Sequence, residues 1–119
     1  MNQYGETAVR AAKYVNAGIA PRDAWEKASC EVFRKGSSLQ KKGCPRTTFL
    51  ALYDSDISSP NALHARDARE YLRSHSINGI TPRELWKIAL MGEEKAYNSQ
   101  MDVVLALYAH DLMPKISAD

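Results

Sequence analysis

Two short stretches decide how this chain is built: GIAPRDAW at residues 18–25 and GITPRELW at residues 79–86. Each begins with a glycine that can end one helix in the left-handed conformation, followed by a proline suited to the first position of the next helix. In the second copy, Thr81 and Glu84 form a capping box, whereas Ala20 provides a weaker cap in the first. Both stretches end on a tryptophan one helical turn after the proline, so Trp25 and Trp86 are predicted to be buried core anchors.

Two further pairs of segments match in the same order on either side of these stretches. AAKYV (11–15) resembles AREYL (68–72), and FLALYDSDI (49–57) resembles VLALYAHDL (104–112). Three ordered matches favour an internal duplication of a three-helix unit, covering about residues 4–57 and 61–113.

Apolar residues recur at spacings of three and four along the whole chain, and strand signals are nearly absent. The sequence therefore predicts an all-α fold, with the duplicated units packed as one compact bundle in a single domain over residues 1–119. A chain of 119 residues, 45% of them hydrophobic, is long enough to bury a core without disulfides or a metal. Six helices are predicted near residues 5–17, 21–34, 45–55, 61–75, 82–92 and 99–113.

Composition and motif content exclude several classes of protein. No apolar run approaches the length of a membrane span, and the start of the chain does not resemble a signal peptide. Cys30 and Cys44 are therefore predicted to be reduced thiols in a cytoplasmic protein. The three histidines form no paired ligand motif with the cysteines, and nothing indicates a cofactor. A net charge of +2 is too small to indicate a nucleic-acid partner without local clustering.

Positive charge does cluster at the predicted start of the third helix. The segment RKGSSLQKKGCPR (34–46) carries five basic residues and no acidic one. In the repeat, Cys44 aligns with Ser99, which is predicted to cap the last helix with Asp102 three residues on, so Cys44 is predicted at the cap and Pro45 in the first turn. The second copy also carries Glu93 and Glu94. Because the first copy has no such carboxylates, the positive start of its third helix is predicted to attract an external anion.

The predicted ligand is a phosphate-bearing molecule, either a nucleotide or a nucleic-acid backbone, bound by a non-catalytic module. Its predicted site is formed by Lys41, Lys42, Gly43, Cys44, Arg46, Thr47 and Thr48, with the backbone N–H groups of Thr47 and Thr48 as fixed donors. The flexible segment Gly36-Ser37-Ser38 is predicted to close around the phosphate.

Three alternatives stay open for this basic segment. The segment is also typical of a solvated loop. A protein–protein adapter or inhibitor that acts on an acidic partner surface is the alternative function. An enzyme that uses Cys44 as its nucleophile is the third, although no histidine stands at a spacing that indicates a catalytic partner.

Three segments, YGETAVRAA (4–12), KKGCPRTTFLAL (41–52) and GEEKAYNSQMDVVLAL (92–107), resemble a family of small uncharacterised bacterial proteins classed as a domain of unknown function. The resemblance spans most of the chain. It implies a bacterial or phage protein in the cytoplasm, and it assigns no activity and no catalytic residues.

Overall fold

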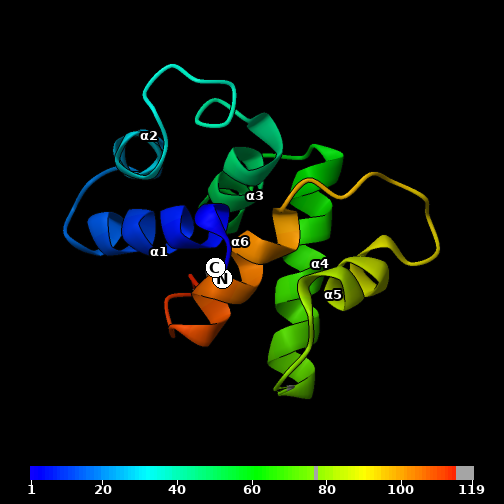
Figure 1. Cartoon of the computed structure of the whole chain (residues 1–119). Coiled ribbons are helices and arrows are strands. Elements are labelled where there is room, and N and C mark those ends of the chain that lie inside the picture. The colour runs from blue at the N-terminus through cyan, green and yellow to red at the C-terminus, as the bar shows by residue number, and fades with distance from the viewer. Residues whose placement is uncertain (77, 115–119) are drawn as a thin grey trace.

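The computed structural model describes residues 1–76 and 78–114, and within them the chain forms α-helices and no strand. The helices are α1 (Gln3–Asn16), α2 (Pro21–Val32), α3 (Gly43–Tyr53), α4 (Pro60–His75), α5 (Pro82–Leu90) and α6 (Gln100–Ala109) (Figure 1). The predicted all-α fold with six helices is confirmed.

The two deciding stretches form the predicted helix junctions. Gly18 and Gly79 have φ angles of 104° and 80°, in the left-handed region that glycine tolerates best. Thr81 Oγ1 accepts a hydrogen bond from the backbone N–H of Glu84 at 3.2 Å, and Glu84 Oε1 accepts one from the N–H of Thr81 at 3.1 Å. This capping box was predicted, as was the weak cap of α2, where Ala20 supplies no side-chain hydrogen bond.

The observed helix bounds lie within two residues of the predicted ones, except that the end of α6 differs by four. Helix α3 begins at Gly43, with Lys42 as its N-cap, so Cys44 lies inside the first turn instead of capping it. Pro45 is the third residue of the helix, where its missing N–H costs nothing because first-turn N–H groups have no partner within the helix. Helix α6 ends at Ala109, because the backbone turns at Asp111, which has a φ of 55°.

The chain has two halves, α1–α3 and α4–α6, and the first helix of each half packs against the last helix of the other. Helix α1 lies against α2 of its own half and against α6 of the other. In the same way, α4 lies against α5 and against α3 of the first half, and α3 contacts α6 at the centre (Figure 1). An approximate two-fold axis between the halves would produce these contacts, although α4 also packs against α6 and α1 has no comparable contact with α3. The internal duplication stays a prediction, and these contacts support it.

Both tryptophans are buried, as predicted. Trp25 is 1% exposed, and its ring centre lies 5.1 Å from that of Phe49 on α3. Trp86 is 4% exposed and packs edge-on against His64 of α4, while its Nε1 donates a hydrogen bond to the carbonyl of Lys95 at 3.2 Å. Each tryptophan therefore ties its own helix to a neighbouring element.

We expect Trp86→Ala to lower the free energy of unfolding by about 3–5 kcal/mol, because it removes a buried ring and leaves a cavity. Chemical denaturation measures the loss. Lys87→Ala, an exposed position on the same helix, is the control and should change stability by less than about 0.5 kcal/mol. A loss below about 1 kcal/mol for Trp86→Ala would show that the ring contributes little to the core.

Two arginines of α4 hold the C-terminal end of α3. Arg66 donates to the carbonyls of Ala51 at 3.3 Å and Asp54 at 2.8 Å, and Arg69 donates to the carbonyl of Leu52 at 2.8 Å. The last carbonyls of a helix lack partners within it and carry partial negative charge. Guanidinium groups donate hydrogen bonds to these carbonyls and also neutralise their charge. This end of α3 is thereby neutralised by the second half of the chain.

Thr48 is fully buried, and its hydroxyl has no hydrogen-bond partner among the described residues. We expect Thr48→Val to raise the free energy of unfolding by about 1 kcal/mol, because the isosteric side chain removes an unsatisfied buried polar group. The matched control is Thr7→Val: Thr7 is equally buried, but its hydroxyl donates to the carbonyl of Gln3 at 2.8 Å. The control should lose stability. Equal effects of the two substitutions in urea denaturation would contradict this account.

Candidate anion-binding site

The residues predicted to form the phosphate site differ in their exposure. Lys41 and Arg46 are exposed, Lys42, Cys44 and Thr47 are half-buried, and Thr48 lies in the core. Because α3 begins at Gly43, the N–H groups of Thr47 and Thr48 fall in its second turn and bond to carbonyls within the helix. The prediction that these two N–H groups are free donors is therefore wrong. The backbone N–H groups that have no partner within the helix are instead those of Gly43 and Cys44 in the first turn.

The segment before α3 folds around a buried side chain, Gln40. Gln40 Oε1 accepts a hydrogen bond from the N–H of Gly36 at 3.3 Å, and the Ser37 hydroxyl accepts one from the N–H of Gln40 at 3.2 Å. Gln40 Nε2 donates to the Ser29 hydroxyl at 2.8 Å, which anchors the loop to α2. Gly36 and Ser37 thus close on a side chain of this protein, and the prediction that they close around a phosphate has no support.

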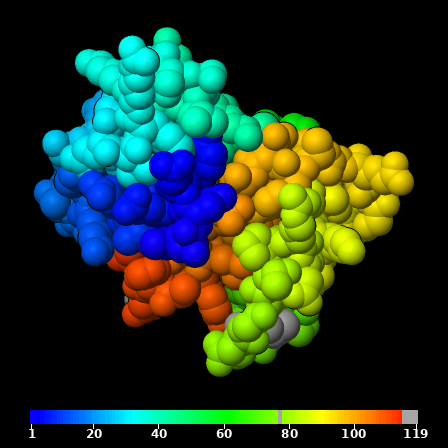
Figure 2. Space-filling view, in the orientation of Figure 1, coloured from blue at the N-terminus to red at the C-terminus, as the bar shows by residue number. Residues whose placement is uncertain are grey.

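A pocket of about 560 Å³ lies where four helices begin. Its lining includes the N-cap residues of α1, α3, α5 and α6, which are Asn2, Lys42, Thr81 and Ser99. We call it the cap pocket. Figure 2 shows the start of α1 beside the start of α6 on this face of the molecule. Helix N-termini carry partial positive charge, so their convergence favours an anion in the pocket.

Three of the four helix starts are already satisfied from within the protein. Asn2 caps α1 and Thr81 caps α5, and the first turns of α1, α5 and α6 each contain a carboxylate: Glu6, Glu84 and Asp102. The start of α3 differs, because no side chain caps it and its first turn has no acidic residue. The start of α3 is therefore not neutralised by a side-chain cap or a first-turn carboxylate.

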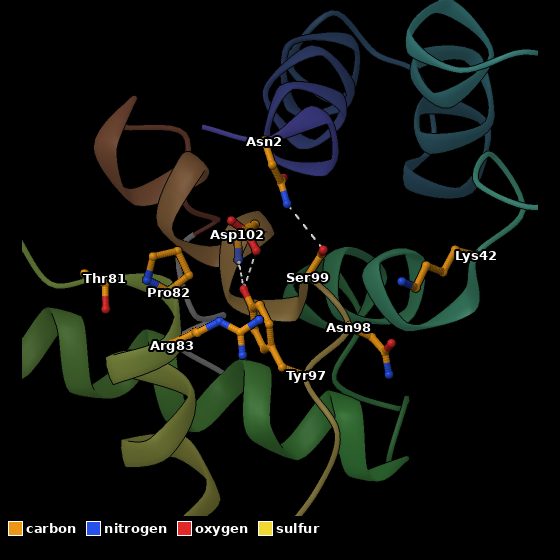
Figure 3. A pocket seen from close by; sticks show the side chains of 9 residues that line it. All are labelled: Asn2, Lys42, Thr81, Pro82, Arg83, Tyr97, Asn98, Ser99 and Asp102. Carbon is orange, nitrogen blue, oxygen red and sulfur yellow. Dashed lines mark hydrogen bonds between the residues drawn. The ribbon is translucent and has the colours of Figure 1, made fainter.

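Two cations face the cap pocket from opposite sides. Lys42 extends from the start of α3 toward Ser99, and Arg83 reaches in from the first turn of α5 (Figure 3). Each is supported by an aromatic ring: the Lys42 ammonium lies 5.7 Å from the centre of the Tyr4 ring, and the Arg83 guanidinium lies 5.2 Å from that of Tyr97. Such contacts hold long cationic side chains near one orientation.

Tyr97 does the capping that was predicted for Ser99. Its hydroxyl accepts a hydrogen bond from the N–H of Asp102 at 3.0 Å and donates one to Asp102 Oδ2. Ser99 makes no side-chain cap and instead accepts a hydrogen bond from Asn2 Nδ2 at 3.3 Å, so the capping role predicted for Ser99 is wrong. Burial and the bond to Asp102 both raise the pKa of Tyr97 above its ordinary value.

Of the residues that line this pocket, Lys42 was predicted as a site residue, whereas no local signal in the sequence pointed to Asn2, Arg83, Tyr97 or Asn98. Lys41 and Arg46, which are close in sequence, do not line it. The helix starts themselves follow from local patterns, as the capping box of α5 shows. Their meeting point depends on how α1 crosses α6, which no local pattern contains.

The described residues offer little support for other chemistry. No group of three His, Cys, Asp or Glu side chains in residues 1–76 and 78–114 is arranged to hold a metal ion. Within the same residues, none of the helices combines the length and apolarity that crossing a bilayer requires. Cys30 and Cys44 are both free. Burial, followed by the neighbouring Glu26 carboxylate, raises the pKa of the Cys30 thiol, which disfavours the reactive thiolate.

Residues 1–114 match the model of a protein family described as Family of unknown function (DUF6979). The chain belongs to this family. The match confirms the resemblance to an uncharacterised family at this level, while the bacterial or phage setting stays a prediction. Neither the curated proteins nor the solved structures contain a match.

The Tyr97 contacts predict a dependence of stability on alkaline pH. The folded protein holds the pKa of Tyr97 above the ordinary value of 10.0, so the unfolded chain loses this proton first. The stabilisation is therefore complete below pH 10 and is lost as the pH rises further. At neutral pH we expect Tyr97→Phe to cost about 1–3 kcal/mol through the lost hydrogen bonds.

The difference in unfolding free energy between the parent and Tyr97→Phe should shrink as the pH rises above 10. Denaturation at a series of pH values measures it. Tyr108→Phe is a matched control for the loss of one phenol. A difference that stays constant or grows with pH would contradict the assigned role of Tyr97.

Proposed function

We propose that this protein is a non-catalytic module that binds a phosphate-bearing ligand in the cap pocket. The observation that carries the proposal is the uncapped start of α3, which contributes Lys42 to a pocket that also contains Arg83. Phosphate groups bind helix N-termini through backbone N–H groups and the helix dipole, and guanidinium groups match their oxygens.

The charge balance of the pocket supports an anion over a cation. Asp102 is the acidic residue in the lining, and Tyr97 already engages one of its oxygens. Lys42 and Arg83 have no carboxylate within ion-pair distance among the ion pairs of the described residues. An anion between these two cations would supply the charge that the protein itself does not.

An acidic protein surface is the second candidate ligand. Lys41 and Arg46 are exposed and lie outside the cap pocket, so a flat partner could contact them together with Lys42. This adapter function would depend on the basic segment as a whole, whereas the proposed phosphate site depends on Lys42 and Arg83.

We expect pyrophosphate to raise the melting temperature of the parent protein at low salt, and to do so less as salt is added, because ions screen exposed charges. Lys42→Glu and Arg83→Glu should each abolish this shift. Lys42→Glu should keep or raise the melting temperature without ligand, because a carboxylate suits the uncapped start of α3. Thermal shift assays measure both effects.

Lys41→Glu and Arg46→Glu are the matched controls, since they change the net charge equally but lie outside the pocket. They should retain the pyrophosphate shift. If the controls lose the shift and Arg83→Glu keeps it, the ligand binds the exposed basic segment predicted from the sequence. If no shift occurs in the parent at low salt, the phosphate proposal is wrong.

A further inference from the structure

A second pocket adjoins the cap pocket and has a different chemical character. It measures about 240 Å³ and shares Pro82 and Asp102 with the cap pocket. The remainder of its wall is mainly apolar. It comes from Met1, from Leu105, Ala106 and Ala109 in the C-terminal part of α6, and from His110, which follows this helix. We call it the apolar pocket. Figure 2 shows the surface hollowed between the C-terminal part of α6 and the segment that leads into α5.

We propose that the two pockets together bind a mononucleotide, with its phosphates in the cap pocket and its base in the apolar pocket. This inference rests on the proposed function, and it adds the class of ligand. It follows from the order of the side chains from the cap pocket to the apolar pocket: two cations, then a carboxylate on the shared wall, then apolar groups.

The shared wall suits a sugar. Asp102 lies between the two pockets, and Tyr97 binds its Oδ2, so Oδ1 can accept hydrogen bonds from ribose hydroxyls. Carboxylates commonly bind ribose in this way in dinucleotide sites. The sequence of cation, carboxylate and apolar wall thus matches the sequence of phosphate, ribose and base. A simple inorganic anion would contact the cations and would leave the carboxylate and the apolar wall without a ligand.

The size of the apolar pocket favours a single base over a nucleic-acid strand. At about 240 Å³ it is less than half the size of the cap pocket and gives room for one planar ring system. Pro82 and Leu105 supply apolar surface, and His110 at the rim supplies ring nitrogens for the polar edge of a base. The larger cap pocket falls within the usual range of about 300–1,000 Å³ for small-molecule sites.

The test compares pyrophosphate with purine and pyrimidine nucleoside diphosphates by isothermal titration calorimetry. Burial of the base should make at least one nucleotide bind more than about tenfold tighter than pyrophosphate to the parent. Ala109→Trp should fill the apolar pocket from an exposed position. It should reduce nucleotide affinity to the level of pyrophosphate, while pyrophosphate affinity stays within about twofold because the cap pocket is unchanged.

Asp54→Trp is the control, because Asp54 aligns with Ala109 in the repeat and lines the corresponding pocket between α2 and α3. It should leave the nucleotide preference intact.

If pyrophosphate binds and every nucleotide binds no tighter, this inference is wrong while the phosphate function stands. The inference is also wrong if Ala109→Trp weakens both ligands equally, or if a short oligonucleotide binds best and is insensitive to Ala109→Trp. If neither pyrophosphate nor any nucleotide binds the parent, both proposals are wrong.

Discussion

The crossing of α1 over α6 is the contact on which the rest of the molecule depends. A Cβ atom at Gly5 would lie 3.1 Å from Ala106 Cβ and 3.2 Å from the carbonyl oxygen of Asp102, so only glycine lets the two helices approach this closely without a shift. The crossing brings the first residues of α1 to the start of α6, where Asn2 donates to Ser99. The halves are joined here, and one wall of the cap pocket is formed by the same contact.

The two ends of helix α3 differ in whether side chains of the protein bind their free backbone groups. Arg66 and Arg69 of the second half neutralise its C-terminal carbonyls. Its N-terminus receives no equivalent group, although the neighbouring starts of α1, α5 and α6 are capped or carry carboxylates. A helix with one end satisfied and the other open retains a net positive potential at the open end. This asymmetry places an uncapped helix start in the lining of the cap pocket.

The candidate site belongs to neither half alone. Lys42 comes from the start of α3 in the first half and Arg83 from α5 in the second, and both line the same pocket. The corresponding pockets beside Pro21 and Pro82 differ in composition: the first contains Arg22, Asp23 and Asp54, whereas the second is mainly apolar. If the halves arose by duplication, as their sequences indicate, they have since diverged in the side chains that line these two pockets.

The sequence by itself determined the helices, the junctions at Gly18 and Gly79, the burial of Trp25 and Trp86 and the positive start of α3, because each depends on residues within one or two turns of one another. It misplaced the start of α3 and the cap of α6, since Lys42 and Tyr97 take these positions through local geometry that the repeat alignment does not encode. Only the tertiary structure decided which cations share a pocket. Lys41 and Lys42 are adjacent in the chain, yet Lys42 faces Arg83, which lies far along the sequence. The physical reason is that a binding site needs side chains that converge in space, and convergence is set by helix packing.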